Sequence, residues 1–170
     1  MIRLEREEPG RYWSPDDPLR WPNGGVRKRW SVTEQEAKVL SLLAHGRKVL
    51  EVGTGLGISA RAMVLTARSV TTIDPDPWIQ ESVELPGVLM LADWPDERVN
   101  KYDMIFIDGD HEAKAVQADL TEARKRLAPG GFMAFHDYVP RVPGVMDGLK
   151  HLDGELILLG TLNRLALYIP

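Results

Sequence analysis

Residues 49–59 read Val-Leu-Glu-Val-Gly-Thr-Gly-Leu-Gly-Ile-Ser, and this stretch decides the fold. A run of residues typical of a buried strand leads into Gly53, Gly55 and Gly57, and a helix-length segment follows. Glycines at alternate positions allow a tight turn and a close approach of backbone to ligand. We expect free amides at the start of the following helix, which attract a carboxylate or phosphate. A plain tight turn without a ligand is the alternative.

The spacing of the three glycines bears on the kind of ligand. A dinucleotide-binding turn has the pattern G-x-G-x-x-G, whereas this turn has G-x-G-x-G and is preceded by the acidic Glu51. The mismatch disfavours a pyrophosphate group. The spacing therefore argues against a nicotinamide-dependent oxidoreductase, which would bind its dinucleotide at such a turn.

Outward from the turn, short apolar segments alternate with segments of helical length. Thr33 and Glu36 form a capping box that predicts a helix over 34–45. Repeated βα units predict a parallel sheet with helices on both faces. Strands are expected at residues 48–52, 70–74, 88–91, 104–107, 132–135, 156–159 and 165–169.

Two apolar stripes at helical spacing are predicted to face the core. They consist of Ile58, Ala62 and Leu65, and of Val116, Leu120, Ala123 and Leu127. The last two strands are joined only by residues 160–164, which are too few for a crossover to a parallel neighbour. We therefore expect an antiparallel hairpin at the edge of the sheet.

Length and composition indicate one compact domain over residues 33–170. The chain has 170 residues, of which 44% are hydrophobic and 27% charged. Residues 1–32 form an irregular segment rich in proline that also contains Trp13, Trp21 and Trp30. Large aromatic side chains are uncommon in a linker that packs against nothing. We therefore expect this segment either to wrap over the core or to form a lid over a substrate pocket.

Charge and cysteine content exclude several classes of function. With 21 Lys and Arg against 25 Asp and Glu, the formal net charge is −4, so we expect no nucleic-acid partner. The chain has no cysteine, which excludes disulfides and thiolate metal sites. No apolar run approaches the roughly 20 residues of a membrane helix, and the start is unlike a signal peptide. A cytoplasmic location without a membrane partner is expected.

Acidic residues follow the next two predicted strands. Asp74 ends the second strand, where a carboxylate can accept two hydrogen bonds from a ribose diol; the alternative is a turn or helix cap assisted by Pro75. Asp93 and Trp94 follow the third strand and suit the amino group and ring of an adenine. The alternative for Asp93 is the cap of a short helix beginning at Pro95.

These residues, in this order, closely resemble class I S-adenosylmethionine-dependent methyltransferases. The resemblance rests on residues 51–57, Asp74, Asp93 and the segment 102–111, and it covers residues 34–170. It implies a Rossmann-like α/β fold, a three-layer sandwich with a seven-stranded sheet in the order 3-2-1-4-5-7-6 and strand 7 antiparallel. It also implies that the glycine turn meets the methionine moiety, Asp74 the ribose and Asp93 the adenine. The residues expected to bind S-adenosylmethionine are Glu51, Gly53, Thr54, Gly55, Gly57, Ser59, Asp74, Pro75, Asp93, Trp94 and Asp108.

Two further segments are expected beyond the carboxyl ends of strands 4 and 5, where ligands of open α/β sheets bind. Residues 106–111 and 134–138 resemble small-molecule O-methyltransferases and, more loosely, the metal-dependent catechol O-methyltransferase type. In that type two aspartates and an asparagine bind magnesium, and a lysine is the general base. Asp108 and Asp137 match the aspartates, but Tyr138 stands at the asparagine position and His111 at the lysine position.

We therefore expect a methyltransferase for a small-molecule acceptor, with a hydroxyl group favoured over an amine. The catalytic candidates are Asp108, His111 and Asp137, with His111 as general base or, alternatively, as a helix cap or a hydrogen-bonding partner of a neighbouring residue. Asp108 and Asp137, completed by waters, are the candidate ligands of Mg²⁺. His136 is expected to orient Asp137 or line the pocket. A cofactor-binding module without activity is the alternative from another class.

The chain has no long insertion that would build an acceptor pocket. We expect acceptor recognition to come from the first 30 residues or from a second subunit, which makes a homodimer a further prediction.

Overall fold

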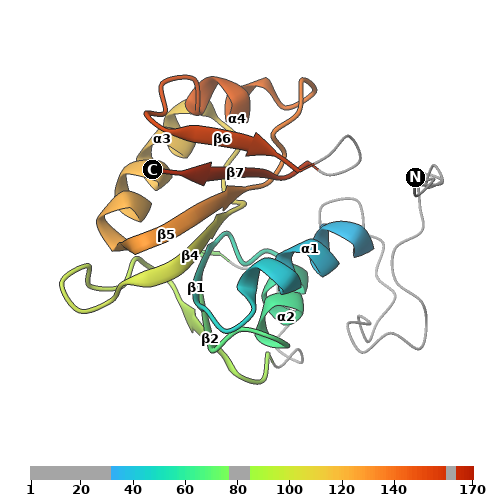
Figure 1. Cartoon of the computed structure of the whole chain (residues 1–170), viewed down its shortest axis with the longest axis vertical. Helices are drawn as coiled ribbons and strands as arrows, with labels where there is room; N and C mark the ends of the chain where they lie inside the picture. Colours follow the sequence, from blue (N-terminus) through green and yellow to red (C-terminus); the bar gives the residue numbers. More distant parts are fainter. Residues whose placement is uncertain (1–31, 77–84, 160–163) are drawn as a thin grey trace.

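A computed structural model describes residues 32–76, 85–159 and 164–170 (Figure 1). Four helices and seven strands are formed by these residues. They are α1 (Glu34–Ala44), β1 (Lys48–Val52), α2 (Ile58–Val64), β2 (Ser69–Ile73), β3 (Val88–Leu91), β4 (Tyr102–Ile107), α3 (Ala113–Arg126), β5 (Leu127–Phe135), α4 (Pro143–Gly148), β6 (Glu155–Leu158) and β7 (Ala166–Ile169).

The strands form one sheet in the order β3-β2-β1-β4-β5-β7-β6. The pairs from β3 to β5 are parallel, whereas β7 runs antiparallel to both β5 and β6. This confirms the predicted order and the terminal hairpin. Residues 160–163, which make up most of the connection between β6 and β7, lie outside the described residues.

Helices lie on both sides of the sheet, α1 and α2 on one and α3 and α4 on the other (Figure 1). Side chains along the central strands alternate between the two layers. In β4, Met104 and Phe106 pack in the cluster that contains α1 and α2, while Ile105 and Ile107 pack in the cluster that contains α3 and α4. The expected three-layer α/β sandwich is thereby confirmed.

The stripe predictions were wrong at Leu65, and the last residue of the other stripe belongs to a different element than predicted. Leu65 follows the last residue of α2 and is 57% exposed, so it does not face the core. Leu127 is the first residue of β5 instead of a member of α3, but it packs against the core as predicted. The remaining members of both stripes are buried as predicted.

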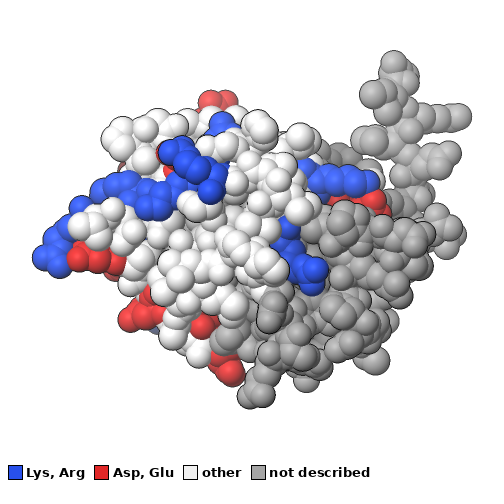
Figure 2. All heavy atoms as spheres, turned by 90° about the horizontal axis from the view of Figure 1, so that it is seen from below, with Lys and Arg blue, Asp and Glu red and all other residues white. Residues whose placement is uncertain are grey.

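Figure 2 shows one face of the molecule, on which Lys and Arg side chains form separate groups among neutral residues, with Asp and Glu nearby. In the part of this face that the structure describes, the basic groups do not merge into one continuous surface. Among the described helices, none has both the length and the apolar character needed to cross a membrane. The predictions for residues 1–31 lie outside the described residues; Val32, where the description starts, is buried.

Candidate active site

The predicted site residues gather at the edge where the parallel strands end. Hydrogen bonds of the sheet continue just past the strands: the amide of Asp108 donates to Val52 O at 2.8 Å and that of His136 to Ile107 O at 3.0 Å. The segments that follow β1, β4 and β5 therefore lie side by side. Because β7 is antiparallel, its amino end reaches the same edge.

Gly53 brings the glycine turn against the end of β4. Its φ is +92°, and a Cβ placed on it would lie 2.2 Å from Asp108 O. Gly55 also has a positive φ, of +48°, but a Cβ there would have nothing within 4 Å. Close packing thus explains Gly53, whereas Gly55 borders open space suited to a ligand.

The amides of the three glycines all pair within the chain. Gly53 donates to Ile73 O at 2.9 Å, Gly55 to a carboxylate oxygen of Asp74 at 3.0 Å, and Gly57 to Thr54 O at 2.7 Å. The turn is so tight that these groups pair within the chain. Attraction for an anion is therefore left to the first turn of α2, where the sequence predicted free amides.

Glu51 lies beneath the turn in a small buried cluster of polar side chains. Ser59 donates to its carboxylate, as does Thr72 at 2.6 Å, and Thr54 in turn lies 2.7 Å from the Thr72 hydroxyl. Burial raises the pKa of Glu51 to about 8, against the hydrogen bonds from Ser59 and Thr72. Glu51, Ser59 and Thr54 thus support the turn from below, and their contact with a cofactor stays a prediction.

Asp74 follows β2 next to the turn. Besides the Gly55 amide, its carboxylate accepts from the amide of Asp76 at 2.9 Å. No helix begins there among the described residues, so Asp74 and Pro75 form a turn that is joined to the glycine turn. The predicted ribose contact would place a diol on a carboxylate that already borders the open space at Gly55.

Asp93 and Trp94 follow β3. Asp93 is exposed and accepts from the amide of Trp94 at 2.7 Å, and no helix begins at Pro95. The centre of the Trp94 ring lies 4.9 Å from the guanidinium carbon of Arg126. Arg126 is the last residue of α3 and directly precedes β5, so it lies at the start of that strand and not at the carboxyl ends where the site is. This neighbour supports a packing role for Trp94, while adenine recognition by Asp93 stays a prediction.

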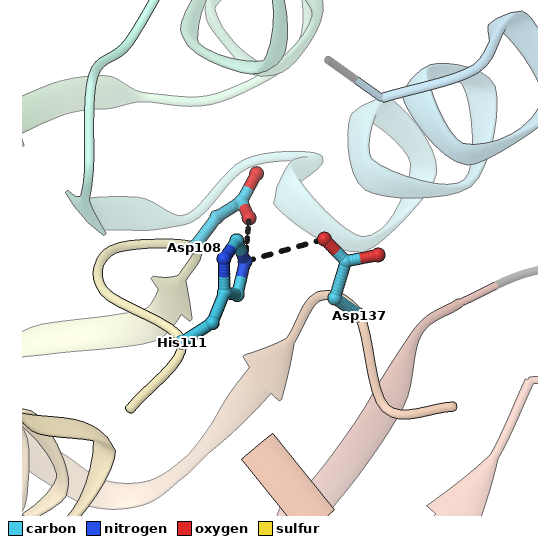
Figure 3. Close-up of side chains that lie close together, drawn as sticks. All are labelled: Asp108, His111 and Asp137. Atoms are coloured by element: carbon cyan, nitrogen blue, oxygen red, sulfur yellow. Dashed lines mark ion pairs between the residues drawn. The ribbon is translucent and has the colours of Figure 1, made fainter. Parts of the chain in front are cut away.

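Asp108, His111 and Asp137 converge at the strand ends (Figure 3). Each offers a ligand atom, and these atoms all lie within 4.8 Å of one another. The His111 Nε2 atom lies 3.2 Å from Asp137 Oδ2 and 3.9 Å from Asp108 Oδ1. Hydrogen bonding and attraction from Asp108 and Asp137 raise the pKa of His111 to about 9, so this imidazole carries a proton at neutral pH. His111 also precedes α3, which begins at Ala113 with Glu112 as its N-cap, and so does not cap that helix.

His136 separates the two aspartates from the interior of the protein. Its Nδ1 lies 3.1 Å from Asp108 Oδ1 and its Nε2 3.2 Å from Glu36 Oε2. Since both nitrogens face carboxylates, both donate, and the ring is an imidazolium with a raised pKa despite its burial. His136 was expected to orient Asp137, from which its Nδ1 lies 3.4 Å, but its shorter contact is with Asp108.

Asp137 has an unusual backbone. Among the described residues it is the one non-glycine residue with a positive φ, of +52°. Burial opposes ionisation of Asp137, but contacts with His111, His136 and Arg164 lower its pKa overall. Asp108 has a lowered pKa for similar reasons, through His136 and His111. Both aspartates are therefore carboxylates at neutral pH, as metal ligands must be.

Sequence reasoning missed two charged residues of this site. Glu36 was assigned only to the capping box, which the structure confirms, yet its carboxylate also contacts His136 and Arg164. Arg164 donates through Nη1 to Asp137 Oδ1 at 2.8 Å. The predicted antiparallel β7 would have placed Arg164 at this edge, but no local signal indicated its partners.

Comparison with known proteins identifies the family. Residues 50–138, just over half of the chain, match the family model described as a methyltransferase domain. The chain belongs to this family. It is an S-adenosylmethionine-dependent methyltransferase domain with a Rossmann-like class I fold, and not a nicotinamide-dependent oxidoreductase. No curated protein matches the chain by sequence.

Several solved structures share the fold. An O-methyltransferase from Bacillus cereus in complex with S-adenosylhomocysteine is 18% identical, with a TM-score of 0.62 and coverage of 83% of both chains. The O-methyltransferase TomG from Streptomyces achromogenes, involved in tomaymycin synthesis and solved with S-adenosylmethionine, is 20% identical, with a TM-score of 0.62 and coverage of 81% of this chain and 80% of TomG. A ribosomal protein L11 methylase from Lactobacillus delbrueckii subsp. bulgaricus is 21% identical, with a TM-score of 0.56 and coverage of 79% and 75%. Because this fold serves different acceptors, the acceptor must be argued from the residues of the site.

Proposed function

We propose that this methyltransferase transfers a methyl group to a hydroxyl group of a small molecule, at the edge formed by Asp108, His111 and Asp137. The contact between Gly53 and the Asp108 carbonyl is the observation that carries the proposal. A cofactor seated on the glycine turn would bring its methyl group next to these three side chains. Proximity of donor and acceptor supplies much of the rate of such a transfer.

The cofactor is proposed to bind along the ends of β1, β2 and β3. The open space at Gly55 and the carboxylate of Asp74 border each other and suit the methionine and ribose parts of S-adenosylmethionine. Asp93 is the proposed partner of the adenine amino group. The similar structures from Bacillus cereus and Streptomyces achromogenes were solved with S-adenosylhomocysteine and S-adenosylmethionine, which supports the choice of cofactor.

A divalent cation between Asp108 and Asp137 is the second part of the proposal. Two ionised carboxylates, completed by waters, offer the oxygen atoms that Mg²⁺ and Mn²⁺ prefer, which leaves His111 beside the ion as a base. The donor set therefore fits such an ion. A bound cation would orient an acceptor hydroxyl and lower its pKa.

His111 is the proposed proton acceptor, and its protonation links it to the cation. In the structure, Asp108 and Asp137 stabilise the protonated ring and raise its pKa to about 9. An ion on these carboxylates would remove that stabilisation and repel the proton. The neutral ring could then accept the proton of an acceptor hydroxyl.

A small acceptor is favoured over a nucleic acid by the net charge of −4. Val32 and Thr33 lead into α1 close to the site, since the Thr33 amide donates to Glu36 Oε2 at 2.7 Å. We therefore keep the proposals that the preceding segment covers the acceptor, or that a second subunit in a homodimer does.

Methyl transfer from labelled S-adenosylmethionine to a panel of phenols, catechols, aliphatic alcohols and amines tests this function. We expect transfer to a hydroxyl compound, stimulated by Mg²⁺ or Mn²⁺ and lost in Asp137→Asn. Transfer confined to amines, or unaffected by Asp108→Asn and Asp137→Asn, would contradict the proposal.

A further inference from the structure

Glu36 is a glutamate in the first turn of a helix, a place that usually faces solvent, yet its side chain is fully buried. One of its oxygens, Oε1, accepts from the backbone amide of Arg164 at 2.9 Å and from Arg164 Nε at 3.1 Å. The other, Oε2, accepts from Arg164 Nη2 at 3.0 Å and faces His136 Nε2 at 3.2 Å. The carboxylate thus joins segments that are 100 and 128 positions away in the sequence.

The far ends of both partners of Glu36 contact the aspartates of the site. His136 reaches Asp108 Oδ1 through Nδ1 at 3.1 Å, and Arg164 reaches Asp137 Oδ1 through Nη1 at 2.8 Å. Negative and positive groups therefore alternate from Asp108 through His136, Glu36 and Arg164 to Asp137. We call these five side chains the ion-pair network of the site.

We propose that Glu36 is a positioning residue of the methyl-transfer site, which fixes Asp108 and Asp137 relative to each other through His136 and Arg164. This inference rests on the proposed function of the two aspartates. Without Glu36, the two cations would lack their shared anion and would be drawn toward Asp108 and Asp137. The carboxylates would then lose the fixed spacing that a cation or an acceptor hydroxyl requires.

Helix capping does not account for the burial and the contacts of Glu36. The capping box needs only one carboxylate oxygen for the Thr33 amide, and a neutral glutamine serves the same purpose. Glu34, in the same turn, pairs with Lys38 at the surface instead. A buried charge is costly unless it is paired, so Glu36 is explained by its two cationic partners.

Four variants separate positioning from capping. Glu36→Gln keeps the shape of the side chain and the capping oxygen but removes the negative charge at the centre of the ion-pair network. Glu36→Gln combined with Arg164→Gln removes one charge of each sign, and is intended for the case in which the single variant does not fold. Thr33→Ala removes the hydroxyl that accepts from the Glu36 amide at 3.2 Å, and Glu34→Gln changes a surface glutamate of the same helix.

Three readouts are compared across the variants: kcat with the best acceptor, the Kd for S-adenosylhomocysteine, and amide NMR signals of residues 108–111 and 136–138. In Glu36→Gln and in the double variant we expect kcat to fall at least tenfold, the Kd to stay within threefold, and these amide signals to broaden or split. Thr33→Ala is expected to lower Tm, and both controls to keep kcat within twofold and the wild-type signals.

The proposal is overturned if Glu36→Gln, or the double variant where the single one does not fold, keeps kcat within twofold and leaves the amide signals unchanged. It is equally overturned if Thr33→Ala has the same effect on kcat as Glu36→Gln, because capping would then suffice. Should the wild-type chain transfer no methyl group at all, the proposed function fails, and the amide signals alone decide on Glu36.

Discussion

The α-carbon of Gly53 lies so close to the carbonyl group of Asp108 that a methyl group on it would come within 2.2 Å of that oxygen. The contact joins the cofactor turn to the acidic end of β4. It also means that Gly53 and Gly55, which look equivalent in the sequence, have different roles.

Gly53→Ala is expected to destabilise the protein by roughly 3 kcal/mol, because a clash with backbone adds to the strain of a positive φ. Gly55→Ala should cost only about 1 kcal/mol, since the new methyl group meets open space, but it should weaken the binding of S-adenosylhomocysteine. Thermal unfolding and calorimetry measure the two effects. Equal losses of Tm in both variants would contradict the assignment.

Asp74→Asn is expected to weaken the binding of S-adenosylhomocysteine about tenfold, because charge-assisted hydrogen bonds to the ribose would become neutral ones. Tm should change little, since asparagine can still accept from the amide of Gly55 or Asp76. Asp76→Asn, at an exposed neighbour, is the matched control. An unchanged Kd in Asp74→Asn would exclude Asp74 from the ribose site.

Glu51 should make the stability of the protein depend on pH. Its pKa is raised from 4.5 to about 8 in the folded state, so between these values the folded protein holds a proton that the unfolded chain has released. Stability is therefore expected to fall as pH rises through this range, by up to about 1.4 kcal/mol per pH unit. Glu51→Gln should flatten the dependence, as measured by urea unfolding from pH 5 to 8.

The control for Glu51 is Glu155→Gln, which changes an exposed glutamate. It should leave the slope of stability against pH as it is in the wild type. A wild-type slope in Glu51→Gln would show that another group causes the pH dependence.

Mn²⁺ binding at the aspartate pair should release a proton near pH 7.5, because the pKa of His111 is about 9 before the ion binds. Calorimetry in buffers of different ionisation enthalpy counts the proton. In Asp137→Asn the affinity should fall at least tenfold, whereas Asp153→Asn, at an exposed aspartate, should bind as the wild type does. Binding that is equally tight in Asp137→Asn would place the ion elsewhere.

Much of the fold could be predicted because its signals are local. The apolar strands, the capping box at Thr33 and the short connection before β7 each depend on residues close together in the chain. Element ends were less predictable: nothing in the sequence near Leu65 indicates that α2 ends at Val64. The pairing of the Gly53 and Gly55 amides could not be predicted, because their partners, Ile73 and Asp74, lie in and just after the next strand.

The site was predictable only in part for the same physical reason. Asp108 and Asp137 follow strands, so the topology of the sheet brings them together. Glu36 already had a sufficient local role as a capping residue, and its contact with Arg164 spans 128 positions. Such a pair is formed by the folded sheet and leaves no periodic pattern in the sequence.

The most direct test of the central claim is calorimetric titration of the whole chain with S-adenosylhomocysteine and, in parallel, with NAD. The account predicts binding of one molecule of S-adenosylhomocysteine per chain in the micromolar range, weakened in Asp74→Asn, and no heat with NAD. Binding of NAD without binding of S-adenosylhomocysteine would contradict it.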